Sequence, residues 1–318
     1  MTSGVAQIKR QQGVILLAFF AILFIAGAGV LISVLDSNAV AQRRNNNTSI
    51  AMREAKELLI AYATLYAVNY NTTNAANPGP GHLPCPDTNG DGIENSPCAA
   101  TNPLGRLPQS IVLPNGNFFP LSDYNAELDE QFWYSVADNF KRDPLGVINS
   151  STVSGTTLDG QGRIAAVLVA PGSANAAQSR PSNTGSRYLE DSNTTAPNFV
   201  SSTAVNPDLF NDRVLAITID EIMVPVTRQV ADLLKAELDA YHVANTWYPA
   251  DQVEFDLVIA APATLWLGAN DWLAMSNYVR VNLNEATLTF DGCPNISYTV
   301  FYNLVDSPDD LRRIGLRC

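Results

Sequence analysis

The chain has 318 residues, of which 46% are apolar and 16% charged, and its formal net charge is −12 at pH 7. The length and apolar content suit one large or two ordinary domains together with an anchor. The 19 Lys and Arg residues are scattered, whereas a nucleic-acid surface needs clustered cations that displace counterions from phosphates. The composition therefore excludes a nucleic-acid-binding protein and fits an exported one.

The first feature in chain order is an uncharged apolar segment, residues 14–35. As a helix it would span about 33 Å, which matches the hydrocarbon core of a bilayer. Three interpretations are open: a secretory signal cleaved after the small residues 39–41, a plain signal anchor, and a prepilin-type leader. The third rests on the basic pair at residues 9–10 and on Gly13, directly before the apolar run. It predicts cleavage between Gly13 and Val14.

The segments that follow predict helices and strands in alternation. Residues 50–70 carry apolar side chains at intervals of three and four, which predicts an amphipathic helix that ends before Pro78. Residues 171–210 are rich in Ser, Asn and Pro and predict a long surface excursion. Further elements are strands at about 163–170, 213–220, 254–260, 278–281, 287–290 and 297–304, and a helix at about 221–244.

The chain holds four cysteines, Cys85, Cys98, Cys293 and Cys318. An even number in an exported protein indicates disulfides, and three pairings are possible. We favour the local pairs, Cys85 with Cys98 and Cys293 with Cys318, each worth about 3 kcal/mol in the chain-entropy model. Free buried thiols are the alternative.

Between the first two cysteines, residues 87–92 match the start of an EF-hand-type calcium loop. Asp87, Asn89 and Asp91 would supply side-chain oxygens, and Ile93 would supply a carbonyl oxygen. The twelfth position, where such a loop carries a bidentate acid, is Cys98. A calcium (Ca²⁺) site and a plain Gly/Asn/Asp turn closed by the disulfide both remain open.

Catalytic and zinc-binding patterns are missing from the sequence. His82, Cys85 and Cys98 lack a fourth zinc ligand at suitable spacing. His242 is the only other histidine. No Gly-x-Ser-x-Gly elbow, phosphate-binding glycine loop or His-Glu-x-x-His pattern occurs. We expect no enzyme.

Several segments together resemble pilin-like proteins of proteobacteria, in the type IV pilin and minor pseudopilin family. The matching segments are Gln11–Gly13, Leu59–Ala63, Leu83–Gly92, Gly105–Pro108, Phe132–Val136 and Asn211–Thr218. The resemblance covers roughly residues 9–250, and the loop sequence LPCPDTNGDG is its most specific part. It implies a subunit that the prepilin peptidase cleaves and that assembles with other pilin or pseudopilin subunits.

One position departs from the family pattern. Ala18 stands where major pilins carry Glu, the fifth residue after the expected cleavage. This indicates a tip or initiating position in a filament, because a subunit with no neighbour ahead of it avoids an unpaired carboxylate in lipid. A generic anchor would also need no Glu.

The sequence thus predicts an α+β fold with a long N-terminal transmembrane helix and a two-lobed α/β pilin-like head. The expected divisions are a leader at 1–13, a transmembrane and stem helix at 14–70, a first lobe at 71–210 with the Cys-stapled loop, and a second lobe at 211–318. The expected function is a minor pilin or pseudopilin of a type IV pilus or type II secretion pseudopilus. It would sit in the inner membrane with a periplasmic head, or at an extracellular filament tip. The alternative is a membrane-anchored periplasmic binding or adhesion module that does not polymerise.

Overall fold

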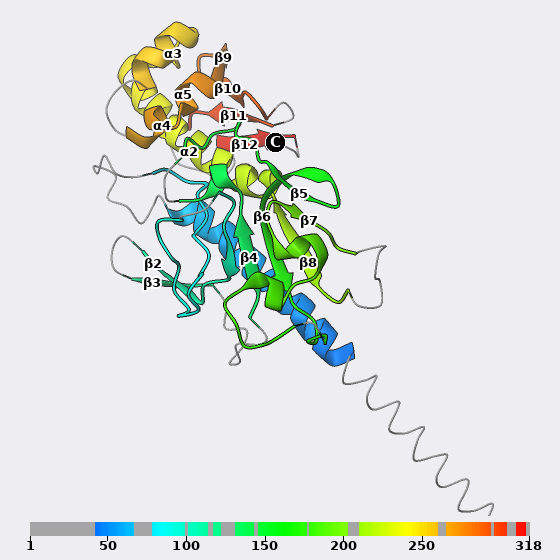
Figure 1. Cartoon of the computed structure of the whole chain (residues 1–318). Helices are drawn as coiled ribbons and strands as arrows, with labels where there is room; N and C mark the ends of the chain where they lie inside the picture. The colour runs from blue at the N-terminus through cyan, green and yellow to red at the C-terminus, as the bar shows by residue number, and fades with distance from the viewer. Residues whose placement is uncertain are drawn as a thin grey trace, which may run out of the picture. The chain divides into compact units, whose positions relative to one another are not determined.

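The computed structural model shows two β-sheets, a first helix at residues 42–65 and a second long helix that contacts both sheets (Figure 1). The described residues are 42–66, 78–98, 101–113, 117–121, 131–142, 146–176, 178–202, 210–259, 265–293, 296–303 and 310–315. Contacts divide the chain into two units, 1–50 and 51–318, and the second unit contains both sheets.

The part of the first helix within the second unit buries one face. Its buried side chains recur at intervals of three or four, as a helical stripe requires. They are Met52, Ala55, Leu59, Tyr62, Ala63 and Tyr66. At the edge of this buried stripe, Lys56 Nζ donates to the carbonyl of Ala216 at 2.8 Å and pairs with Glu221 at 2.6 Å. The helix is therefore fixed by both apolar packing and a charged contact.

The larger sheet is built around one central strand, β6. Its members are β1 (Leu104–Arg106), β4 (Trp133–Val136), β5 (Thr156–Leu158), β6 (Gln161–Ala170), β7 (Asn198–Phe199) and β8 (Arg213–Thr218). β8 pairs along one edge of β6, and β4 and β5 share the other edge. A separate ribbon joins β2 (Ser110–Val112) to β3 (Phe118–Pro120).

Both faces of this sheet are buried, which explains the continuous apolar run of β6. Ala166 and Leu168 belong to the main core with the first helix, whereas Val167 and Val169 face a second cluster with Tyr188 and Phe199 from the excursion at 171–210. The excursion thus covers one face of the sheet. The short 3-10 helices η4 (Gly185–Arg187) and η5 (Asp191–Thr194) lie within it, and η3 (Asp138–Phe140) follows β4.

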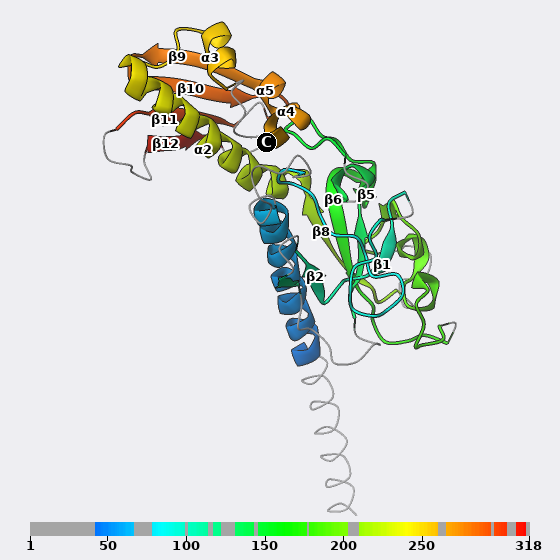
Figure 2. The ribbon, with the colours of Figure 1, turned by 90° about the vertical axis from the view of Figure 1, so that its left-hand side faces the viewer.

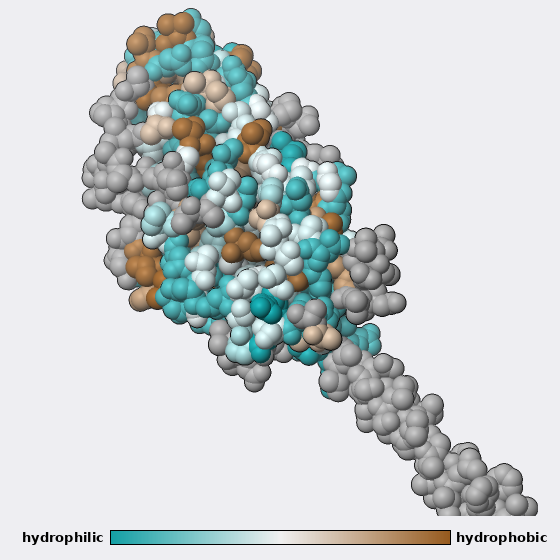
Figure 3. All heavy atoms as spheres, in the orientation of Figure 1, coloured by the Kyte–Doolittle hydropathy of each residue, from teal (hydrophilic) through white to brown (hydrophobic). Residues whose placement is uncertain are grey.

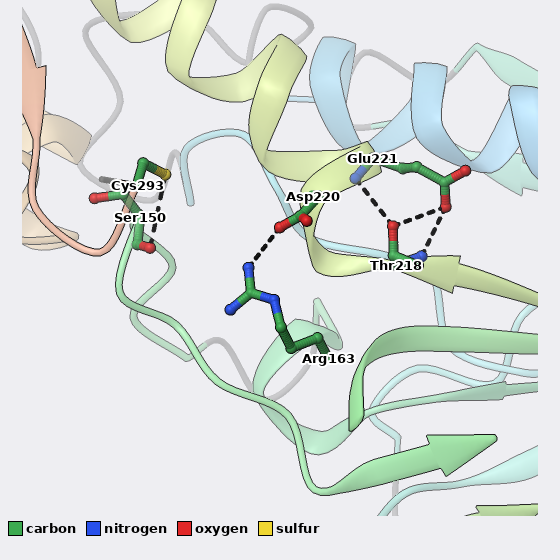
Figure 4. Close-up of polar contacts among 6 residues, drawn as sticks. All are labelled: Ser150, Arg163, Thr218, Asp220, Glu221 and Cys293. Carbon is green, nitrogen blue, oxygen red and sulfur yellow. Dashed lines mark hydrogen bonds and ion pairs between the residues drawn. The ribbon is translucent and has the colours of Figure 1, made fainter. Parts of the chain in front are cut away.

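The second long helix, α2 (Ile219–Asn245), starts directly at the end of β8. A capping box fixes this start: Thr218 Oγ1 accepts from the Glu221 N–H at 3.3 Å, and the Glu221 carboxylate accepts from the Thr218 N–H at 2.8 Å (Figure 4). Asp220 in the same turn pairs with Arg163 at 2.5 Å. The start of α2 is therefore bonded to β6 and to the first helix.

Further along, α2 packs on a four-stranded antiparallel sheet, as Figure 2 shows. The sheet has the order β12-β11-β10-β9, with β9 (Ser276–Asn282), β10 (Glu285–Phe290), β11 (Ser297–Phe301) and β12 (Leu311–Ile314). Thr227 of α2 meets the Tyr298 hydroxyl at 3.1 Å, and Arg228 donates to the Leu311 carbonyl at 2.8 Å. The short helices α3 (Gln252–Ile259), α4 (Leu265–Ala269) and α5 (Trp272–Met275) connect α2 to β9.

The fold class expected from the sequence is wrong. The described residues form a mixed α/β structure rich in strands, and their first helix begins at residue 42. Among the described residues, no helix has both the length and the apolar character needed to cross a membrane. A long N-terminal transmembrane helix is therefore not shown, because the apolar segment 14–35 lies outside the described residues.

The expected strand at residues 254–260 is also wrong, because this segment forms α3. Its alternating apolar residues suited a strand, but Phe255 and Ile259, four apart, are the ones buried. Asp251 accepts a hydrogen bond from the Glu254 N–H at 3.0 Å, which supports a helix start. Val253 and Leu257 are left 69% and 74% exposed.

The expected division into lobes at 210/211 stays a prediction. β8 follows that boundary and pairs with β6 of the larger sheet, and β9 to β12 form the smaller sheet.

Candidate functional site

Some predicted site residues lie outside the described residues. These are Gly13 and Val14, at the expected cleavage point, and Cys318. The structure places the remaining ones in two regions. Cys85, Asp87, Asn89, Asp91, Ile93 and Cys98 share one loop beside the larger sheet, and Cys293 follows β10.

Cys85 and Cys98 form a disulfide with a Cα–Cα distance of 5.4 Å, and both are buried. Cys293 is also disulfide-bonded. Its sulfur lies 3.9 Å from the carbonyl oxygen of Ser150 (Figure 4). This is a packing contact, since a disulfide sulfur carries no proton to donate.

Three side chains at alternate positions of the loop each accept a hydrogen bond from the backbone two residues ahead. The acceptors are Asp87, Asn89 and Asp91, and the donors are the N–H groups of Asn89, Asp91 and Ile93, at 3.1, 3.0 and 2.8 Å. These are consecutive Asx turns, the local geometry that Asp and Asn favour. The alternation read from the sequence thus shapes the loop by hydrogen bonding.

Asp87 is the central acceptor of the loop and is 1% exposed. Besides the Asn89 N–H, its carboxylate accepts from Gly90 at 2.6 Å and from Gly92 at 2.8 Å. Gly90 and Gly92 have φ values of +82° and +84°, a region that glycine enters without strain. The carboxyl group satisfies three backbone donors, which explains why a polar side chain is tolerated in this buried position.

The loop supplies little of the ligand set that calcium prefers. Both Asp87 oxygens accept N–H groups, and Asn89 Nδ2 donates to Asp91 Oδ2 at 2.9 Å. Cys98 is in the disulfide. Within the described residues, no group of three or more His, Cys, Asp or Glu side chains is placed to hold a metal. The geometry favours a turn held by hydrogen bonds and a disulfide, and calcium binding stays a prediction.

Glu94, the nearest acid after the loop, points inward. Its Oε2 accepts from the Cys85 N–H at 3.1 Å, and its Oε1 pairs with Arg142 at 2.8 Å. Arg142 also donates to the Tyr66 hydroxyl at 3.1 Å. The Tyr62 ring lies beside the Tyr66 ring at a tilt of 39°, with centroids 5.0 Å apart, and burial raises the pKa of the Tyr62 hydroxyl far above its ordinary range. This Glu94–Arg142 cluster ties the disulfide loop to the first helix.

The other side of the loop is bonded to the larger sheet. Asp87 and Arg106 exchange two backbone hydrogen bonds of 2.9 and 2.7 Å. A side chain at Gly105 would place its Cβ 2.6 Å from the Asp87 carbonyl oxygen, so this position needs glycine. The Tyr134 hydroxyl donates to the Pro84 carbonyl at 3.1 Å. Segments that are separate in sequence thus meet at the loop.

A buried arginine is the feature that sequence reasoning missed. Arg106 is 1% exposed, and its guanidinium carbon lies 5.3 Å from the Trp133 ring and 4.8 Å from the Tyr188 ring. It donates to the Ser182 carbonyl at 2.7 Å, which anchors the excursion. Cation–π contacts of this kind stabilise a desolvated guanidinium. The only feature of the sequence that could have indicated the burial of Arg106 was its position next to apolar residues within Gly105–Pro108.

Both histidines, His82 and His242, are buried and packed against other parts of the chain. His82 is buried, and its Nε2 lies 3.0 Å from the Gly146 carbonyl oxygen. Burial lowers the pKa of His82, so its ring is neutral at pH 7. His242 stacks on Tyr302 with centroids 3.7 Å apart.

Comparisons of the chain with protein-family models, with curated proteins and with solved structures found no match in any of the three.

Proposed function

We propose that this chain is a pilin-like subunit, a minor pilin or pseudopilin, that is cleaved between Gly13 and Val14. It inserts in the inner membrane through its uncharged N-terminal segment. It then assembles with other pilin or pseudopilin subunits into a type IV pilus or type II secretion pseudopilus. It acts by assembly and catalyses no reaction.

One observation carries the proposal. Four of the six segments on which the resemblance to pilin-like proteins rests lie around one loop, although they are far apart in the sequence. Leu83–Gly92 is bonded to Gly105–Pro108, and β1 pairs with β4 in Phe132–Val136. Tyr62, within Leu59–Ala63, packs beside Tyr66, which contacts Arg142. Segments that contact one another in the folded chain constrain each other's residues, so we expect them to occur together in the sequences of one family.

The disulfide supports a location outside the cytoplasm. The Cys85–Cys98 bond would be reduced by cytosolic thiols and persists in an oxidising compartment such as the periplasm. The uncharged segment 14–35 lies on the N-terminal side of this disulfide-bonded part. An inner-membrane protein with a periplasmic head fits both features.

The mature N-terminus tests the proposal. We expect mass spectrometry of the protein from cells with an active prepilin peptidase to show a chain that begins at Val14. Gly13→Leu should block this cleavage, because the peptidase site requires the small residue, whereas Gly4→Leu should leave it unchanged. An intact wild-type chain, or one that begins at Gln42, would contradict the proposal.

The second candidate is a membrane-anchored periplasmic binding or adhesion module that does not polymerise. Ala18 favours it, since a generic anchor needs no Glu at that position. Shearing filaments from the cells separates the two candidates. The pilin proposal expects the mature chain in the sheared fraction, and the second candidate expects it only in the membrane fraction.

A further inference from the structure

A polar cavity of about 550 Å³ opens at one end of the four-stranded sheet. The β9–β10 turn forms one side, and four residues at the ends of β11 and β12, namely Phe301, Tyr302, Asn303 and Asp310, form the other. Its lining residues are Asn282, Asn284, Glu285, Phe301, Tyr302, Asn303 and Asp310. The volume lies within the range of about 300–1,000 Å³ that is typical of small-ligand sites.

Hydrogen bonds between its own residues hold the cavity in shape. Asn282 Nδ2 donates to Glu285 Oε2 at 2.8 Å, and the Asn282 Oδ1 accepts from the Asn284 N–H at 2.9 Å. Across the cavity, the Tyr302 N–H donates to the Asn284 carbonyl at 3.0 Å. Asn303 Nδ2 donates to Asp310 Oδ1. A ligand would therefore meet side chains that are already oriented, which lowers the entropic cost of binding.

An aromatic stack supports the inner wall. The ring of His242, from α2, stacks on Tyr302 with centroids 3.7 Å apart and meets the Tyr248 ring edge-on at 5.3 Å. His242 Nε2 lies 2.7 Å from Asn284 Oδ1. His242 thus fixes both an aromatic ring and a carboxamide of the lining, and Phe301 adds a second ring.

Three planar polar groups of the lining each use one of their two polar atoms in hydrogen bonds among the described residues. Within the part of the chain that the structure describes, the hydrogen bonds use Glu285 Oε2, Asn284 Oδ1 and Asn303 Nδ2. The second atoms of these groups, Glu285 Oε1, Asn284 Nδ2 and Asn303 Oδ1, have no partner among these described residues. They offer two acceptors and one donor.

We propose that this cavity binds a neutral saccharide of about disaccharide size. A sugar hydroxyl donates and accepts at once, so neighbouring hydroxyls match a wall that mixes carboxylate and carboxamide groups. Hydrogen bonds to the Glu285 carboxylate are the strong, charge-assisted kind. The apolar C–H face of a sugar ring packs on an aromatic ring, here Phe301 or Tyr302.

Other ligand classes fit this wall less well. An apolar ligand would desolvate the carboxamides and carboxylates without replacing their hydrogen bonds. An anionic sugar or phosphate would face Glu285 and Asp310 in a chain whose net charge is −12. The inference goes beyond filament assembly and holds whether or not the chain polymerises.

Saturation-transfer NMR on the full-length protein, in a non-glycosidic detergent, tests the inference. The probes are maltose, cellobiose, lactose and chitobiose, with sialyllactose as the charged comparison and CaCl₂ in a separate titration. We expect at least one neutral disaccharide to bind with a Kd of about 0.1–10 mM, equivalent to a binding free energy of roughly −5.5 to −2.7 kcal/mol.

Substitutions at two lining positions and at one matched control position locate the binding. Glu285→Ala and Asn303→Ala should each weaken the binding about tenfold, equivalent to about 1.4 kcal/mol. Thr287→Ala, on β10 outside the cavity, should not change it. A Tm equal to that of the wild-type chain shows that a variant is folded. Because two lining variants are used, the test still works if one of them fails to fold.

Three outcomes overturn the inference. The first is that none of the four neutral disaccharides binds. The second is that binding persists unchanged in both lining variants. The third is that sialyllactose alone, or Ca²⁺ alone, binds in a Glu285-dependent way, which would assign the cavity to another ligand.

Discussion

Two buried carboxyl groups, Asp87 and Asp212, have different surroundings. The Asp87 carboxylate accepts hydrogen bonds from three backbone N–H groups, which satisfy its oxygens. Asp212 accepts from the Glu190 N–H at 2.8 Å and from Asn193 Nδ2 at 3.1 Å, yet burial and the neighbouring Glu190 carboxylate raise the pKa of Asp212 to about 7. The Asp87 carboxylate therefore stabilises its loop through backbone hydrogen bonds, whereas burial favours the protonated form of Asp212.

The raised pKa of Asp212 predicts a stability that falls as pH rises. Between the ordinary pKa of 3.8 and about 7 the folded state binds more protons than the unfolded state, so the free energy of unfolding decreases toward neutral pH. Asp212→Asn should remove this slope and stabilise the protein at pH 8, by about 1.4 kcal/mol for each tenfold difference in proton affinity between the folded and unfolded states. Urea unfolding at pH 4 to 8 measures it.

The exposed carboxyl Asp256 provides the matched control for Asp212. Asp256→Asn should keep the slope of the wild-type chain. A slope that persists unchanged in Asp212→Asn would show that another group causes it.

Asp87→Ala separates the two interpretations of the loop. Removal of the carboxylate leaves three backbone donors without their acceptor, so we expect a loss of about 2–5 kcal/mol in the free energy of unfolding in EGTA as well as in calcium. The calcium hypothesis requires in addition that Ca²⁺ raise the Tm of the wild-type chain. Asp91→Asn, which keeps an Asx acceptor, should abolish that increase. Equal Tm values in EGTA and Ca²⁺ would reject the metal.

Among the elements, the first helix and the disulfide loop are joined through Arg142. This arginine pairs with the buried Glu94 and also bonds Tyr66 of the helix. Helix α2 is joined to the first helix by Glu221, which serves its capping box and pairs with Lys56. Single charged side chains thus fix how neighbouring elements meet, in addition to apolar packing.

Arg142→Met tests the joint between loop and helix. The change removes the cation that lies 2.8 Å from the buried Glu94 carboxylate, and the expected loss on breaking such a buried ion pair is about 3–5 kcal/mol in the free energy of unfolding. Adding Glu94→Gln should recover part of that loss, because the uncompensated charge is removed. Arg187→Met, at an exposed position in η4, should change stability by less than about 0.5 kcal/mol. Denaturant unfolding compares the four proteins. A similar small change for Arg142→Met would mean that the joint contributes little.

At the scale of the whole molecule, α2 is the element that contacts both sheets within the second unit. At the start of β9, one edge strand of the smaller sheet, the Gln252 amide accepts from the Tyr278 N–H at 2.6 Å and donates to the Ser276 carbonyl at 3.3 Å. These two backbone groups are therefore not open to pairing with another chain. Figure 3 shows apolar residues gathered over α3, where Val253 and Leu257 are exposed.

Local patterns in the sequence determined part of this protein. The strands β6 and β8, the helix α2 and the amphipathic helix after residue 50 follow from periodicity. The Asx-rich loop and its local disulfide follow from residue types and spacing. These features depend on residues that are close in sequence, so they can be predicted from the sequence without knowledge of the tertiary structure.

Tertiary structure decided the rest. Residues 252–259 became α3 because Phe255 and Ile259 found a core and Asp251 supported the helix start, although alternation predicted a strand. The burial of Arg106 and the cavity beside Glu285 both depend on segments that approach from distant parts of the chain. Contacts across such separations leave no periodic signal, so only the packed molecule specifies them.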